Sequence, residues 1–115
     1  MTRVPFSLDS PHGMVTTHGT VSLDADALVI ETRRMLLDLV AHGRDTFRLP
    51  VGEIVSIGVE RGLVSHKLII EPFSFDGLEG FPGDPDVALE LPIKRKHCDR
   101  AEALAQEARR RNLPL

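Results

Sequence analysis

Residues 93–100, IKRKHCDR, gather the side chains in this chain that are best able to do chemistry. The segment holds four Lys or Arg residues, His97 and Cys98, which is the only cysteine of the chain. A cysteine beside a histidine and several cations can have a lowered pKa and act as a nucleophile, provided that it is exposed. The same basic residues could instead contact phosphate groups. The segment could therefore hold either a reactive thiol or a binding site for an anion.

The spacing of the apolar residues that follow favours a buried thiol over a reactive one. A stripe with spacings of three and four residues predicts an amphipathic helix, and it consists of Cys98, Ala101, Leu104, Ala105 and Ala108. Asp99 and Glu102 have the spacing of a capping box, which predicts Asp99 as the N-cap. On this stripe Cys98 serves as a small buried hydrophobic residue. A small enzyme with a reactive Cys98 is the less favoured alternative.

Other residue types that catalyse or bind metals do not cluster in the sequence. The five histidines show no H-x-x-x-H spacing, and Cys98 has no second cysteine as a partner. The acidic pairs at 24/26 and 84/86 fall in expected turns, where two carboxylates do not by themselves have raised pKa values. We therefore expect no catalytic residue, no metal and no cofactor, and hence a protein that is not an enzyme.

Length and composition indicate one globular domain. The chain has 115 residues, of which 42% are hydrophobic and 27% charged. No apolar run approaches the ~20 residues of a membrane span. A single cysteine cannot form an internal disulfide, so we expect a cytoplasmic protein. The expected organisation is a flexible N-terminal arm at 1–13, one domain at 14–112 and a tail at 113–115.

Charge is distributed unevenly along the chain. Residues 93–112 hold seven Lys or Arg against three acids, a balance of +4, while the remainder holds seven against fourteen, a balance of −7. The candidate anion contacts are Lys94, Arg95, Lys96, Arg109, Arg110 and Arg111. Tyr and Trp are absent and the body is acidic, so nucleic acid is disfavoured as a partner. Weak nucleic-acid or phosphate binding through these residues remains an alternative function.

Alternating apolar residues predict the β-rich body that must position these groups. Strands are expected at 15–23 and 28–34, joined by a tight turn at 24–27, and Gly19 inside the first indicates a bend or a close approach of backbone. Further strands are expected at 35–40, 46–50, 54–60, 67–72 and 86–92, with a turn at 42–45. Two buried sets follow from the alternation, Val55, Ile57 and Val59 in one strand and Val87, Leu89 and Leu91 in another. This pattern predicts a mainly β fold with one C-terminal helix.

Three stretches of the sequence carry a resemblance to a known family. GTVSLDADALVIE, RLPVGEIVSIGVERGLVSHKLII and LEGFPGDPDVALELPIKRKHCDRAEALA are similar to a small bacterial family of pleckstrin-homology-like proteins without an assigned activity. The resemblance covers about residues 13–110. It implies a partly open barrel of six to seven antiparallel strands, capped by the C-terminal helix.

The resemblance also bears on ligands. In lipid-binding relatives, phosphoinositide head groups bind beside a basic loop between the first two strands. Here that loop is LDADAL, and Asp24 and Asp26 would repel phosphate, so no phosphoinositide is expected at this loop. Binding of a peptide between a strand edge and the terminal helix, as in phosphotyrosine-binding relatives, stays open.

Residues 73–86 are one candidate surface for a protein or peptide partner. This long expected loop contains Phe73, Phe75, Leu78 and Phe81, three of the five phenylalanines. Such a loop either packs over the body or exposes an apolar patch. The sequence is compatible with a packed loop and with an exposed patch.

A second candidate surface is the segment MLLDLV at 35–40. If Leu36 and Val40 fill the core, then Met35, Leu37 and Leu39 point outward. An outward apolar row on an edge strand favours pairing with a second copy, which predicts a homodimer. Taken together, these surfaces predict a noncatalytic binding or adaptor module that binds a protein or peptide, or itself.

Overall fold

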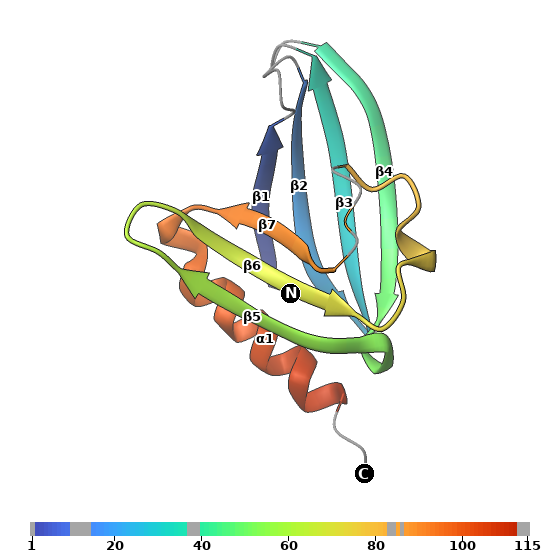
Figure 1. The fold of residues 1–115 in the computed structure, drawn as a ribbon, viewed down its shortest axis with the longest axis vertical. Coiled ribbons are helices and arrows are strands. Elements are labelled where there is room, and N and C mark those ends of the chain that lie inside the picture. The colour runs from blue at the N-terminus through green and yellow to red at the C-terminus, as the bar shows by residue number, and fades with distance from the viewer. Residues whose placement is uncertain (1, 10–14, 37–39, 83–84, 86, 113–115) are drawn as a thin grey trace.

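The computed structural model describes residues 2–9, 15–36, 40–82, 85 and 87–112. Within them the chain forms seven strands followed by one α-helix (Figure 1). The strands are β1 (Arg3–Asp9), β2 (Val15–Asp24), β3 (Ala27–Leu36), β4 (Val40–Pro50), β5 (Ile54–Arg61), β6 (His66–Pro72) and β7 (Leu89–Ile93). Short 3-10 turns lie at η1 (Val51–Glu53), η2 (Asp76–Leu78) and η3 (Arg95–His97), and the helix α1 is Cys98–Asn112.

The strands form two antiparallel sheets, in the orders β1-β2-β3-β4 and β5-β6-β7. In Figure 1 the three-stranded sheet crosses in front of the long strands of the first sheet, and α1 runs along β5. The prediction of a mainly β fold with one C-terminal helix is confirmed. No hydrogen-bonded ladder joins the two sheets in the part of the chain that is described, so they do not close into a barrel there.

The core lies between the two sheets and the helix. Leu28 and Ile30 of β3 and Leu68 and Ile70 of β6 are all fully buried, because alternate residues of each strand point to one face. The predicted helix stripe is also confirmed, since all five of its residues are buried. Burying this stripe is the main way in which a short helix gains stability from a sheet.

The structure differs from the expected flexible arm at Arg3–Asp9. These residues form β1 and pair with β2, with Phe6 opposite Gly19. Val4 and Phe6 are buried, and Leu8 packs against the core. Pro5 interrupts this short alternation of apolar residues, and Pro11 and Gly13 follow it, so the sequence does not suggest a strand here. Residues 10–13 lie outside the described residues.

A bulge changes the expected burial in β5. The pairing with β6 shifts between Ile54 and Ser56, so one extra residue enters β5 and the inward parity changes there. Ile54 and Ile57 are consequently buried, whereas Val55 is 57% exposed and Val59 is partly buried. The expected buried row Val55, Ile57 and Val59 is therefore wrong at Val55.

Burial at the start of β7 also differs from the expectation. Leu89 and Leu91 are buried, as the alternation predicts, but Val87 precedes the strand and is exposed. A parity argument holds only inside a paired strand, and Val87 has no partner strand to fix its direction.

The turn expected at residues 42–45 is wrong, because these residues lie within β4. Met35 pairs with Thr16 of β2 and Ala41 of β4, so β3 has a neighbour on both sides. An interior strand cannot recruit a second chain by its edge, and Met35 therefore does not provide the dimer edge expected from the sequence. Leu37 and Leu39 lie outside the described residues.

Candidate functional site

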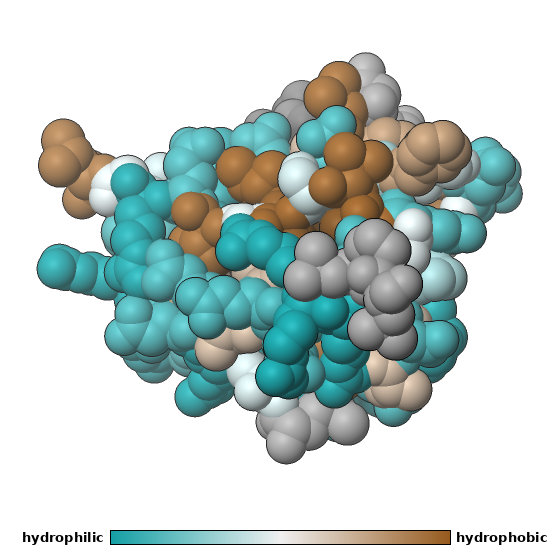
Figure 2. Space-filling model, turned by 90° about the horizontal axis from the view of Figure 1, so that it is seen from below, coloured by the Kyte–Doolittle hydropathy of each residue, from teal (hydrophilic) through white to brown (hydrophobic). Residues whose placement is uncertain are grey.

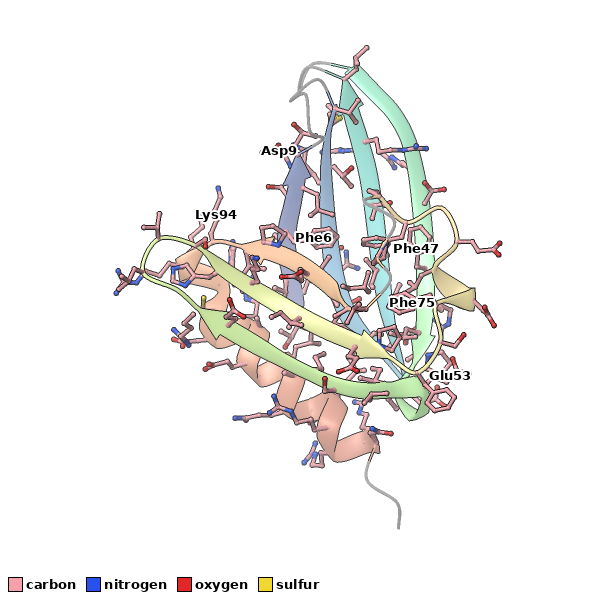
Figure 3. All side chains as sticks on the ribbon, in the orientation of Figure 1. Phe6, Asp9, Phe47, Glu53, Phe75 and Lys94 are labelled. Carbon is pink, nitrogen blue, oxygen red and sulfur yellow. The ribbon has the colours of Figure 1, made fainter. Side chains whose placement is uncertain are left out.

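The Phe-rich segment after β6 divides into packed and exposed parts. Leu78 and Phe81 are buried, and the Phe81 ring meets the Phe47 ring edge-on, with centroids 5.2 Å apart. Phe75 is partly buried against the same core (Figure 3), whereas Phe73 is 82% exposed. Three of the four predicted contacts thus pack against the core, and Phe73 is the one of the four that lies at the surface.

The junction at residues 93–100 places Cys98 inside and its basic neighbours outside. The Cys98 thiol is fully buried and lies 3.9 Å from the carbonyl oxygen of Lys94, to which it donates. A nucleophilic thiol needs access to its substrate, so this geometry does not favour a reactive Cys98. Burial lowers the pKa of His97 below 6.5, and the charges of Lys96, Arg100 and Lys94 lower it further.

The predicted N-cap at Asp99 is wrong. The helix begins at Cys98, directly after η3, so Asp99 lies inside the first turn. Its carboxylate accepts from Nη2 of Arg61 at 2.9 Å, and Arg61 also bonds Glu102. The acidic first turn of α1 is therefore tied to the end of β5. The Arg61 hydrogen bond is the main reason that the pKa of Glu102 lies below 4.5.

The six candidate anion contacts fall into two groups with different surroundings. Lys94, Arg95 and Lys96 are exposed and form no ion pair with any described residue. At the far end of α1, Arg110 and Arg111 both bond Glu107, which lowers the pKa of that carboxyl. These two guanidinium groups are already partly neutralised.

Arg109 is the third arginine at that end, and it meets the free edge of β5. Its Nε donates to the carbonyl oxygen of Ile57 at 2.9 Å, and its Nη2 donates to the same oxygen. Asn112 donates in the same way to the carbonyl oxygen of Ile54 at 3.0 Å. Gly58 leaves room for this arrangement, because a Cβ there would lie 3.1 Å from Arg109 Nη2. Side chains of α1 thus satisfy backbone acceptors that a further strand would otherwise use.

A groove of about 250 Å³ lies where these groups meet. It is lined by Ile54, Val55, Ser56, Ile57, Ala108, Arg109 and Asn112. One wall is the edge of β5 and the other is the last turns of α1, and the lining residue Val55 is exposed. This is the strand-edge-and-helix juxtaposition that the sequence left open for a peptide. The residues that form it were not among the predicted contacts, except for Arg109.

Two exposed apolar side chains at the β5–β6 hairpin were also missed from the sequence. Leu63 and Val64 are almost completely exposed and lie beside Lys94 and Arg95. A brown group projects at the left of Figure 2, on the side where this hairpin lies in Figure 1. The segment GLVSH predicts a turn, but its sequence does not show that Leu63 and Val64 are exposed. Their exposure depends on which other parts of the chain pack beside the turn.

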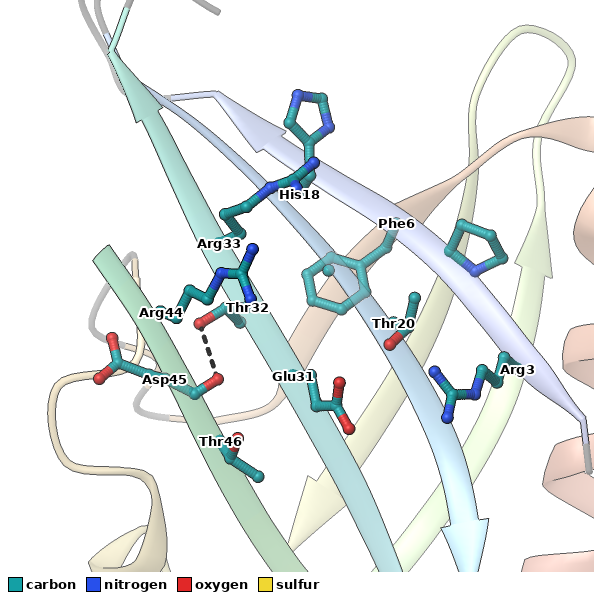
Figure 4. A pocket seen from close by; sticks show the side chains of 12 residues that line it. Arg3, Phe6, His18, Thr20, Glu31, Thr32, Arg33, Arg44, Asp45 and Thr46 are labelled. Atoms are coloured by element: carbon teal, nitrogen blue, oxygen red, sulfur yellow. Dashed lines mark hydrogen bonds between the residues drawn. The ribbon is translucent and has the colours of Figure 1, made fainter. Parts of the chain in front are cut away.

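A larger hollow, of about 660 Å³, lies on the outer face of the four-stranded sheet. Figure 4 shows the charged and hydroxyl side chains that line it. None of these residues was predicted as a site. Among the described residues, no group of three or more His, Cys, Asp or Glu side chains is placed to hold a metal ion. No described helix is long and apolar enough to cross a membrane.

Comparisons of the chain with protein-family models, with curated proteins and with solved structures found no match.

Proposed function

We propose that this protein is a noncatalytic binding module of the pleckstrin-homology-like type, which binds an extended peptide between the edge of β5 and α1. The order of the elements supports this architecture: four antiparallel strands, three antiparallel strands and a terminal helix. The buried Cys98 thiol is consistent with a reducing compartment, and a cytoplasmic location is part of the proposal.

The observation that carries the proposal is the unpaired edge of β5. This strand is the outer member of its sheet, and its only described edge partners near the groove are side chains. The Ile57 carbonyl points away from β6, so the backbone groups of Val59 and Arg61 face the same edge. A peptide in extended conformation can add to such an edge through its own backbone.

The groove also supplies the means of selecting a peptide. Val55 lines the groove and is exposed, so it offers an apolar contact to a side chain of the peptide. To bind the Ile57 carbonyl, the peptide must first displace Arg109. Arg109 and Asn112 therefore protect the edge from unwanted strand pairing when no peptide is present.

Peptide selection followed by site mapping tests the proposal. Random peptides displayed on phage are selected against the folded protein, and the enriched peptide is titrated into isotope-labelled protein by NMR. We expect the largest amide shifts at Ile57 and Val59 and in the last two turns of α1. The variant Arg109→Ala frees the Ile57 carbonyl, so we expect tighter binding of the same peptide by calorimetry. Arg95→Ala, which removes an exposed cation remote from the groove, is the matched control.

Two results would count against this function. Enriched peptides that shift amides only outside β5 and α1 would place the binding surface elsewhere. Equal affinities for the parent, Arg109→Ala and Arg95→Ala would show that the β5 edge is not used.

The weaker alternative, binding of phosphate or nucleic acid by residues 94–96 together with 109–111, receives less support. Arg110 and Arg111 share Glu107, and Arg109 is engaged by Ile57, so the second half of that surface is already occupied.

A further inference from the structure

The outer face of the four-stranded sheet carries a row of basic side chains that the sequence does not reveal. His18 of β2 lies directly opposite Arg33 of β3, and Arg33 lies directly opposite Arg44 of β4. Their neighbours Gly19, Thr32 and Asp45 occupy the alternate positions, and Thr32 is buried, so the basic row points outward (Figure 4). Adjacent strands are ~4.8 Å apart, so the row spans about 10 Å.

Within the part of the chain that the structure describes, the charges of Arg33 and Arg44 are not balanced by ion pairs. Arg33 and Arg44 face each other across two strands, and like charges in that position repel. Neither forms an ion pair with any described residue, whereas their neighbours Arg34 and Arg48 pair with Asp45 and Asp24 at 3.6 Å and 3.3 Å. Of these four arginines on β3 and β4, two are therefore neutralised by carboxylates and two are left to interact with something outside the chain.

The hollow of about 660 Å³ runs beside this row. The opposite bank, meaning the side of the hollow away from the basic row, is formed by Thr20, Glu31 and Thr46. Each of these lies two residues from a member of the row on the same strand, and Arg3 of β1 also lines the hollow. Two hydroxyl groups can donate hydrogen bonds into the hollow. The lining holds three arginines against Glu31 and Asp45, a balance of 3 − 2 = +1. Asp45 occupies an alternate position and pairs with Arg34, so the remaining four groups sum to 3 − 1 = +2 and suit a ligand with two negative charges.

We propose that this hollow binds a small phosphorylated anion with at least two negative charges, such as the pyrophosphate group of a soluble metabolite. The planar guanidinium groups of Arg33 and Arg44 suit paired phosphate oxygens, to which arginine donates two parallel hydrogen bonds. Glu31 can accept from a hydroxyl or a protonated phosphate oxygen, and it repels excess negative charge on that bank.

A small ligand fits the surroundings better than an extended polyanion. The chain as a whole has a net charge of −3, and acidic residues such as Asp9, Asp24 and Asp45 lie on the strands around the row. A long nucleic acid or a charged membrane would have to approach these carboxylates as well. The site is on the β1–β4 sheet, so it is separate from the peptide groove at β5 and α1 and does not depend on it.

Calorimetry with inorganic pyrophosphate and with orthophosphate, at about 50 mM and about 150 mM salt, tests the proposal. We expect pyrophosphate to bind more tightly than orthophosphate. Arg33→Gln and Arg44→Gln should each weaken pyrophosphate binding by about tenfold or more, since each removes a charge-assisted contact. Glu31→Gln should strengthen binding, because it removes the only carboxylate of the opposite bank.

Two control variants separate a site from general attraction. Arg48→Gln alters an exposed arginine on the same sheet face that is paired with Asp24, and Arg95→Gln alters an exposed arginine elsewhere. Both should leave pyrophosphate affinity unchanged. Because Arg33 and Arg44 repel each other in the free protein, their Gln variants should keep the parent melting temperature, so that lost binding cannot be attributed to unfolding.

The proposal would be overturned by an absence of pyrophosphate binding at millimolar concentration in the parent protein. Equal weakening by Arg48→Gln or Arg95→Gln would also overturn it, because it would indicate nonspecific attraction. Vesicles containing phosphatidic acid and a single-stranded oligonucleotide form two further arms. Binding of either in preference to pyrophosphate, with the same dependence on Arg33 and Arg44, would overturn the assignment to a small soluble ligand.

Discussion

Phe73 and Phe81 occupy opposite environments within one segment of the chain. Phe81 is buried and packs edge-on against Phe47. Phe73 directly follows β6 and is exposed, and its backbone N–H donates to the carbonyl of Glu53 at 2.6 Å. At the scale of single residues, the segment is therefore part of the core and has one exposed aromatic ring.

Substitution of Phe81 by Ser should destabilise the protein strongly. Truncation of a buried phenylalanine leaves a cavity and costs about 3–5 kcal/mol of unfolding free energy. Urea unfolding followed by circular dichroism measures the loss. Phe73→Ser is the matched control in the same segment, and it should change the stability by no more than about 0.5 kcal/mol. Similar effects of the two substitutions would contradict the packing described for Phe81.

At the scale of strands, the absence of a side chain at Gly19 lets β1 and β3 approach β2 closely. A Cβ at this position would overlap the Phe6 ring on one side and lie 2.7 Å from the carbonyl oxygen of Glu31. The Phe6 side chain could shift, but the Glu31 oxygen belongs to the backbone of an adjacent strand and cannot.

We therefore expect Gly19→Ala to lower the unfolding free energy by about 1–3 kcal/mol, the usual cost of overpacking. Thermal and urea unfolding both report this change. Gly52→Ala is the control, because no atom lies within 4 Å of the Cβ position there and it should be close to neutral. A Gly19→Ala variant as stable as the parent would mean that β1 and β2 are less closely packed than described.

At the scale of the whole molecule, Arg61 connects the three-stranded sheet to the C-terminal helix. It lies at the end of β5, and its guanidinium bonds both Asp99 and Glu102 on the first turns of α1. This contact joins two elements that are about 40 residues apart in the sequence. The hydrogen bond from Arg61 is also the main cause of the lowered pKa of Glu102.

The lowered pKa of Glu102 makes stability depend on pH in a defined direction. A carboxyl whose folded pKa lies below its unfolded value contributes stability above that unfolded value, 4.5, and loses the contribution as the pH falls through the folded pKa. We expect Arg61→Gln to flatten the fall in stability below about pH 5, because the Glu102 pKa then returns toward its ordinary value. Urea unfolding from neutral to acidic pH provides the comparison. Arg95→Gln should retain the slope of the parent, and an unchanged slope in Arg61→Gln would contradict this role.

The sequence alone was sufficient for a mainly β fold with one C-terminal helix, for the helix stripe and for much of the strand order. The apolar residues of α1 repeat with the period of a helix, and Leu28, Ile30, Leu68 and Ile70 alternate with the period of a strand, so local geometry decides which side each faces. The burial of Cys98 followed from the same stripe, and the close approach at Gly19 followed from the absence of a side chain in a strand. The resemblance suggested that a peptide binds between a strand edge and the terminal helix, but the sequence did not show which residues line that groove.

Tertiary structure decided the register, and with it both candidate sites. Periodicity shows which residues share a face of a strand, but it does not show which residue of the next strand lies opposite, because pairing depends on turns and bulges. The bulge at Val55 reversed the local parity of β5 and opened the groove beside Arg109. Likewise, residues 18, 33 and 44 are far apart in the chain, and only the pairing of β2, β3 and β4 aligns these side chains into one row.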